Sequence, residues 1–130
     1  MKKTIIISTM ALCFSVVTLH ANPSVKNLGN YPMHLKNVKV SPFCISIAKG
    51  DFEMVNKLVE LGVDVNQKSE GMTPAMYAAK YNRADILKLL IEKGANLKLK
   101  SDKGMTALKY AEIHGADDAK FIIEDALSNK

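Results

Sequence analysis

Apolar and polar positions repeat along this chain as a block with a fixed period. The segment 71–75 (GMTPA) returns thirty-three residues later as 104–108 (GMTAL), and each copy leads into apolar positions at helical spacing. A period of this length is typical of one supersecondary unit that is copied and stacked. The sequence therefore predicts a stack of helical repeats, an architecture that usually provides a binding surface and seldom a catalytic site.

Each repeat predicts a first helix of about two turns. Thr73 and Pro74 mark its start, because a threonine side chain can cap the free backbone amides and proline needs no donor at the first helical position. Ser41 and Pro42 repeat this signal. The helix is predicted to end at residues that tolerate a left-handed backbone, which in the three copies are Gly50, Asn82 and Gly115.

A second helix follows in each repeat, with one apolar face. Its predicted core positions are Ile86, Leu87, Leu89, Leu90 and Ile91 in the middle copy, and Met54, Val55, Leu58 and Val59 in the first copy. Both helices run to a glycine, Gly62 or Gly94. The alternating segments after these glycines, 63–66 and 95–98, predict a loop or hairpin that returns the chain to the next repeat.

This arrangement resembles the ankyrin repeat family, whose repeat combines a Thr-Pro-Leu-His start, a Leu-Leu helix and a Gly-Ala-Asp-Val-Asn end. The middle copy carries the resemblance through Gly71, Thr73, Pro74, Ala78, Ala79, Lys88, Leu89, Leu90, Glu92, Gly94 and Ala95. The resemblance implies an all-α solenoid of about three helix-turn-helix repeats with short hairpin connections. We place the domain at 41–130, with repeats at about 41–68, 69–101 and 102–130.

The chain departs from the family pattern in ways that bear on stability. The family histidine is replaced by Cys44, Met76 and Lys109, so we expect a typical stabilising hydrogen bond to be missing. The third copy has Ala107 in place of the proline and lacks a glycine after its second helix. Such a copy is typical of a terminal capping repeat, whose outer face must be polar.

The first 21 residues predict a secretory signal peptide, because a short basic start is followed by an apolar stretch that ends near Leu19. We expect cleavage near Ala21, with Asn22 as the mature start. An uncleaved membrane anchor and a lipid anchor on Cys13 are the alternatives. Residues 22–40 form an N-terminal segment, either a cap on the first repeat or a free tail that binds a partner.

Length, charge and cysteine content limit the classes of partner and chemistry that we expect for this chain. Without residues 1–21 the chain has 109 residues, enough for one small domain, and its formal charge falls from +5 to +3 because Lys2 and Lys3 are removed. Basic and acidic residues are interspersed and no arginine cluster occurs, so nucleic acid is not an expected partner. Cys44 is then the remaining cysteine, and its apolar neighbours favour a buried packing role over a redox or metal role.

Groups that could carry chemistry are few. His34 and His114 stand in no metal-ligand pattern, and we expect neither a metal nor a cofactor. Asp117 and Asp118 close to His114 could act as an acid and base pair, but the start of a helix is the favoured interpretation, because its dipole attracts negative side chains. The sequence contains no phosphate-binding loop and no nucleophile motif. We therefore expect a protein that is not an enzyme.

The resemblance also implies a binding surface, made by the hairpin tips and the exposed side of the first helices. The corresponding residues are Glu70, Met72, Lys80, Tyr81, Asp102, Lys103, Met105, Ile113 and His114. Exposed tyrosine and methionine side chains are typical interface anchors. The alternative for Met72 and Met105 is that they only cover the base of each hairpin.

These expectations combine into a monomeric, periplasmic or secreted ankyrin-repeat protein that binds an unidentified protein partner and does not associate with a membrane after cleavage. Small exported bacterial proteins of this family include helpers of catalase or haem handling and immunity proteins that neutralise secreted toxins, and the sequence does not choose between them. A small-ligand carrier, with His34, His114 or a methionine as a haem ligand, is the alternative from another class.

Overall fold

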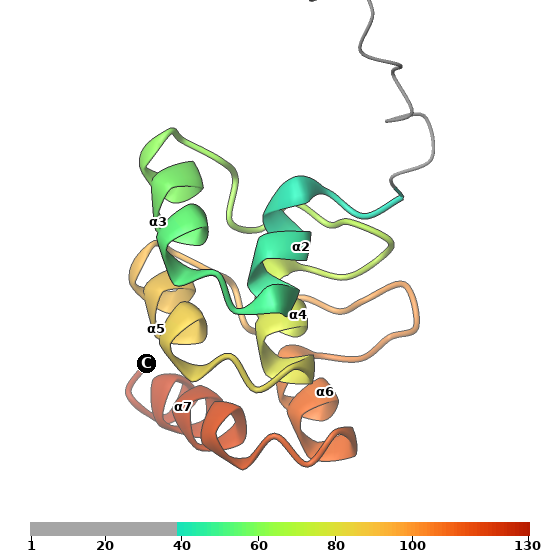
Figure 1. The fold of residues 1–130 in the computed structure, drawn as a ribbon. Coiled ribbons are helices and arrows are strands. Elements are labelled where there is room, and N and C mark those ends of the chain that lie inside the picture. The colour runs from blue at the N-terminus through green and yellow to red at the C-terminus, as the bar shows by residue number, and fades with distance from the viewer. Residues whose placement is uncertain (1–38) are drawn as a thin grey trace, which may run out of the picture. The chain divides into compact units, whose positions relative to one another are not determined.

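The computed structural model describes residues 39–130, which form a stack of helix pairs (Figure 1). Its helices are α2 (Pro42–Lys49), α3 (Phe52–Glu60), α4 (Pro74–Lys80), α5 (Ala84–Glu92), α6 (Ala107–Ile113) and α7 (Asp117–Ser128). Residues 39–130 contain no β-strand, and their β-structure is limited to an isolated bridge between Ser69 and Met72. The predicted all-helical stack is confirmed. The predicted signal peptide and nearly all of the N-terminal segment lie outside the described residues.

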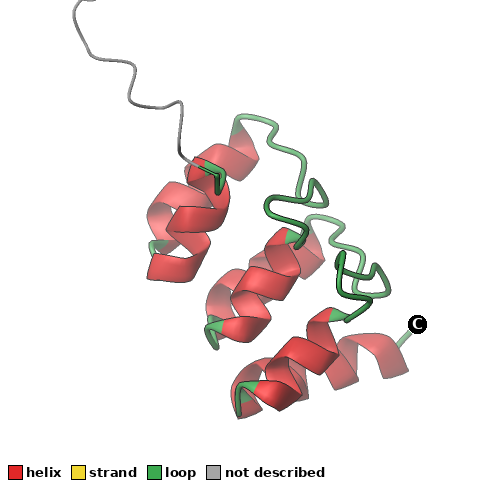
Figure 2. Ribbon diagram, turned by 90° about the vertical axis from the view of Figure 1, so that its right-hand side faces the viewer, coloured by secondary structure: helices red, strands yellow, loops and turns green. Residues whose placement is uncertain are grey.

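The helices form two layers. Helices α2, α4 and α6 lie side by side in one row, and α3, α5 and α7 form a second row behind it (Figures 1 and 2). The connections between consecutive repeats project from the first row (Figure 1). We call residues 39–49, 62–80 and 94–113 the hairpin layer, and α3, α5 and α7 the outer helices. No helix in the described range is long and apolar enough to cross a membrane.

Side-chain caps begin the first helix of every repeat, as predicted for Ser41 and Thr73. The hydroxyl oxygens of Ser41, Thr73 and Thr106 accept hydrogen bonds from the backbone N–H three residues later, at 3.2, 3.3 and 3.3 Å. One expectation was wrong in the middle repeat. The backbone N–H of Thr73 donates to the sulfur of Met76 at 3.3 Å, so the methionine that replaces the family histidine still contributes a weak hydrogen bond.

The predicted left-handed positions are also confirmed. Gly50, Asn82 and Gly115 have φ angles of 81°, 52° and 62°. Asn82 adopts this backbone although it is not glycine, and its side chain also forms two hydrogen bonds with the third repeat. Its Oδ1 accepts a hydrogen bond from the N–H of Ala119 at 3.0 Å, and its Nδ2 donates to the carboxylate of Asp118 at 3.1 Å. Asn82 thereby connects the middle repeat to α7.

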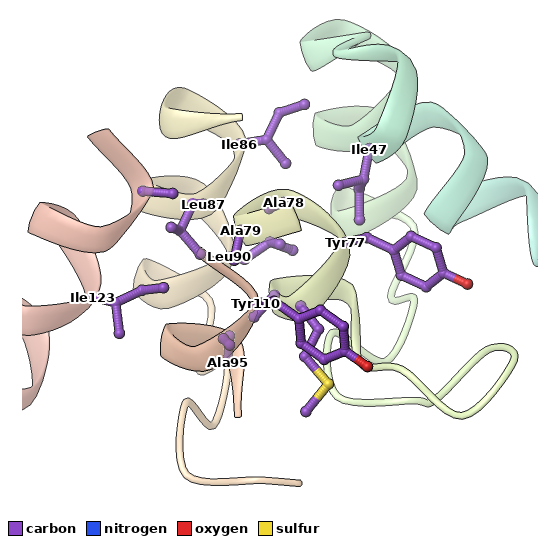
Figure 3. Packing of buried hydrophobic residues seen from close by; sticks show 14 of the residues in the cluster. Ile47, Tyr77, Ala78, Ala79, Ile86, Leu87, Leu90, Ala95, Tyr110 and Ile123 are labelled. Atoms are coloured by element: carbon purple, nitrogen blue, oxygen red, sulfur yellow. The ribbon is translucent and has the colours of Figure 1, made fainter. Parts of the chain in front are cut away.

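The core runs continuously between the two layers and across all repeats (Figure 3). Leu87 and Leu90 of α5 are fully buried, as are Ala78 and Ala79 of α4. The alanines allow α4 to pack against α2, α5 and α6 at once, because small side chains permit a close approach of helices. Burial of each large aliphatic side chain stabilises the fold by about 1.5–3 kcal/mol.

The predicted core of the first outer helix is partly wrong. Val55 is fully buried, but the side chain of Met54 is 45% exposed. Its counterparts in the later repeats, Ile86 and Ala119, are 2% and 0% exposed. The reason is position in the stack. Each later outer helix packs against a preceding one, whereas α3 is the first outer helix of the described chain.

Candidate functional site

A groove of about 350 Å³ lies between the second and third repeats on the hairpin layer. It is lined by residues from two hairpins and from helices α4 and α6, namely Glu70, Gly71, Met72, Lys80, Ser101, Asp102, Lys103, Met105, Tyr110, Ile113 and His114. The structure thus brings eight of the nine residues predicted from the sequence into one place. Tyr81 is the ninth, and it does not line this groove.

The rim of the groove is built by two hairpin tips that bind each other. The backbone N–H of Asp102 donates a hydrogen bond to the carbonyl oxygen of Gly71 at 3.0 Å. The Nζ of Lys68 lies 3.3 Å from the Asp102 carboxylate. Glu70 and Gly71 both have left-handed backbones, with φ angles of 51° and 74°, which turns the tip tightly. The two tips therefore form one connected edge.

Two buried tyrosines brace the bases of these hairpins. The hydroxyl of Tyr77 donates to the carbonyl oxygen of Ser69 at 3.0 Å, and the hydroxyl of Tyr110 is 3.2 Å from Oγ of Ser101. Both rings point in the same direction from their helices (Figure 3). Burial raises the pKa of the Tyr77 hydroxyl, which keeps it protonated as a donor.

These bracing residues are missing from the sequence-based site. A signal for them exists in the chain, because the two tyrosines recur at the same thirty-three-residue spacing as the hairpins. Ser69 and Ser101 also fall at nearly this spacing. Only the structure shows that each tyrosine reaches back to the hairpin of its own repeat.

Methionine and isoleucine side chains supply the apolar part of the groove. Met72 and Met105 are partly buried and pack against the core, and both also line the groove. The methionines therefore cover the bases of the hairpins and also offer part of their surface to a partner in the groove. Ile113 is 56% exposed at the end of α6. The ring of His114 stacks on Tyr110, with centroids 6.5 Å apart and planes 5° from parallel.

Tyr81 lies beside the groove rather than in it. It follows the last residue of α4, and its side chain is 42% exposed. The Nζ of Lys80 lies 5.3 Å from the centre of the Tyr81 ring, within the range of a cation–π contact. Lys80, which does line the groove, is thus oriented by its neighbour in the chain.

The other candidate groups have structural positions. Cys44 is 1% exposed, and burial raises the pKa of its thiol, so its predicted packing role is confirmed. Asp117 and Asp118 open α7, as favoured from the sequence. Among residues 39–130, no group of three or more His, Cys, Asp or Glu side chains could hold a metal ion.

A larger hollow of about 550 Å³ lies at the start of the described chain, near Lys39, Pro42, Leu58 and Val63. This hollow lies at the start of the described range, and its volume and lining are those of the described residues only. The groove between the second and third repeats has described residues on every side. That groove is therefore the better defined candidate site.

Comparison with known proteins supports the repeat architecture. A family model described as ankyrin repeats (3 copies) matches residues 15–101 and, in a second overlapping match, residues 43–130. The first match begins ahead of residue 41, where the sequence predicts the first repeat. No curated protein matches the chain significantly.

Proposed function

Because this chain belongs to the ankyrin repeat family, whose repeats are typically non-enzymatic protein-binding modules, we propose that it binds a protein partner through the groove of the hairpin layer. The observation that carries this proposal is the gathering of two methionines and an exposed isoleucine in one groove with a charged rim. Apolar centres surrounded by polar rims are typical of protein interfaces.

The construction of the groove supports this role. Its walls are fixed by hydrogen bonds between hairpins and from the buried tyrosines, so a partner would meet a preorganised surface. Preorganised surfaces lose less conformational entropy on binding. The methionine side chains remain adaptable within this frame, which suits them to contact an irregular partner.

The place of action is proposed from the sequence. The basic start and apolar stretch of residues 1–21 favour export, with cleavage near Ala21. We propose that the mature protein works in the periplasm or outside the cell. The buried position of Cys44 suits an oxidising compartment, because a shielded thiol is protected from pairing with other thiols.

Substitution of Ile113 by aspartate tests the binding surface. This side chain is 56% exposed, so a charge there should leave the fold intact while placing an unpaired carboxylate in the groove. We expect capture of the partner from cross-linked periplasm to fall at least about five-fold, since an interface anchor contributes more than about 1 kcal/mol. Leu61→Asp is the matched control, at an 82% exposed position after α3. Equal capture by both variants would remove the groove from the proposal.

A further inference from the structure

We propose that the partner of this groove is an acidic protein segment, in which carboxylates flank an aliphatic or aromatic side chain. This inference rests on the proposed protein-binding function and names the chemistry of the partner. It follows from an uneven distribution of charge between the two layers of the stack.

The hairpin layer carries eight lysines against four acidic residues, a formal balance of +4. Its lysines are Lys39, Lys49, Lys68, Lys80, Lys98, Lys100, Lys103 and Lys109, and its acidic residues are Asp64, Glu70, Asp102 and Glu112. The outer helices have the opposite balance. They carry eight acidic residues against three lysines, a formal charge of −5. A small overall net charge therefore conceals two layers of opposite sign.

Ion pairs within the hairpin layer neutralise two of its lysines and two of its carboxylates, so its formal balance stays at +4. Lys68 pairs with Asp102, and Lys109 pairs with Glu112, each at 3.3 Å. Six lysines of this layer then remain outside any ion pair in the described chain, against two carboxylates, Asp64 and Glu70. Exposed pairs of this kind add little stability, but they neutralise the charges that they join.

The opposite charge of the outer helices cancels this excess only in part. Packed helices lie about 8–10 Å apart, and screening in physiological salt acts over about 8 Å. A partner seated on the hairpin layer is therefore attracted by the near lysines more than it is repelled by the acidic residues behind them. Such local fields select partners and accelerate their encounter.

Two of the free lysines stand at the groove itself. Lys80 and Lys103 line it together with Met72, Met105 and Ile113. An apolar side chain of the partner fits between the methionines, and neighbouring carboxylates reach the two lysines. Glu70 and Asp102 also line the groove. Asp102 is paired with Lys68, and Glu70 can accommodate one basic residue among the carboxylates of the partner.

The chemistry favours protein over nucleic acid. Arg83 is the single arginine of the chain, and its guanidinium binds the carbonyl oxygen of Ala48 at 2.7 and 3.0 Å. The positive groups of the hairpin layer are thus all lysines, without the arginine forks that recognise phosphates. Tyr110 is the tyrosine that lines the groove, and it is 5% exposed, so this groove offers no exposed phenylalanine, tyrosine or tryptophan ring of the kind on which single-stranded bases stack.

The test uses the mature protein with isotope-labelled methionine methyl groups. The probes are short synthetic peptides in which Asp and Glu flank a central Leu or Phe, and matched peptides with Lys in place of the acidic residues. We expect the acidic peptides alone to shift the methyl signals of Met72 and Met105. Met54, which is 45% exposed on α3, serves as the internal control and should not shift.

Charge reversal completes the test. The double variant Lys80→Glu with Lys103→Glu should bind the acidic peptides about ten-fold more weakly, because two attractive pairs become repulsive. The matched double variant Lys57→Glu with Lys88→Glu, on the outer helices, should bind them unchanged. Binding of the acidic peptides that is equally weakened by both variants would overturn the proposal.

The remaining outcomes separate this inference from the proposed function. Shifts of Met72 and Met105 with the lysine peptides would overturn the acidic partner and leave a protein-binding groove. Equal binding of single-stranded DNA or phosphatidylglycerol vesicles would overturn both the acidic peptide and the protein class. Absence of any shift with either peptide set, together with unchanged capture by Ile113→Asp, would overturn both proposals.

Discussion

The backbone N–H of Asp102 donates a hydrogen bond to the carbonyl oxygen of Gly71 at 3.0 Å, and this bond joins the hairpins of the second and third repeats. A Cβ atom at position 71 would lie 2.6 Å from Oδ2 of Asp102 and 3.0 Å from its Cβ. The close approach of the two tips thus depends on glycine. The shape of the candidate groove depends on this contact, because both residues line it.

Gly71→Ala should destabilise the protein by about 2 kcal/mol or more, through the left-handed backbone and the contact with Asp102. Chemical unfolding monitored by circular dichroism measures the loss. Gly104→Ala is the matched control, because Gly104 has a similar φ of 76° but nothing within 4 Å of its Cβ position. The control should lose about 1 kcal/mol from backbone strain alone. Equal losses would show that the hairpin contact adds nothing.

Asn82 separates backbone strain from a cap between repeats. Asn82→Gly keeps the left-handed backbone but removes the hydrogen bonds to Ala119 and Asp118, and should lower the unfolding free energy by about 1 kcal/mol. Asn82→Ala removes the same bonds and also strains the backbone, so its loss should be about 2 kcal/mol. If Asn82→Gly is as stable as the original protein, the hydrogen bonds of the Asn82 side chain do not stabilise the stack.

Cys44 should be shielded in the folded protein. Its side chain is 1% exposed, and burial raises the pKa of the thiol above its ordinary value of 9.0. We expect a thiol reagent to modify the mature native protein far more slowly than the urea-unfolded protein, because the thiolate is the reactive form. Rapid modification without denaturant would contradict the buried assignment.

The same burial predicts a loss of stability at alkaline pH. Cys44 and Tyr77 both have raised pKa values in the folded state, so folding retains their protons. Their contribution is fully present below the pKa of the unfolded thiol, near 9.0, and falls as the pH rises above it. Cys44→Ala should make the unfolding free energy less sensitive to pH above this value. An unchanged pH profile would assign the alkaline loss to other groups.

Export makes a separate prediction. Expression of the full chain in a Gram-negative host should yield a periplasmic protein whose mass corresponds to a start at Asn22. Leu12→Arg places a charge in the apolar stretch and should retain the full-length chain in the cytoplasm. Recovery of the unprocessed original protein from the membrane fraction would favour the anchor alternative instead.

The sequence predicted the repeat signals because these are local. A Ser-Pro or Thr-Pro start, a left-handed helix end and an apolar face each depend on a few adjacent residues, and the structure places Ser41, Thr73 and Asn82 accordingly. The error at Met54 arose from a different cause. Its apolar character predicts burial, but burial at this position depends on whether an outer helix precedes α3 in the stack, and no local pattern of residues contains that information.

For the candidate site, too, the sequence predicted the positions that each repeat fixes locally and missed the properties that arise from packing. Family habit located eight groove residues, because hairpin tips and helix faces occupy fixed positions in each repeat. Tyr81 was predicted with them from the same family resemblance, yet it follows the end of α4, and its ring contacts Nζ of Lys80 outside the groove. The separation of charge between the two layers was not recognised from the sequence, where acidic and basic residues are interspersed. It emerges only when the chain folds them onto opposite sides.

Site-specific photo-cross-linking in living cells tests the central claim most directly. A photoreactive phenylalanine replaces Ile113 in the groove or, as the control, Phe121 on α7, which is 72% exposed. We predict a discrete protein adduct from position 113 and none from position 121. An adduct from position 121 alone, or from neither position, would contradict binding through the groove.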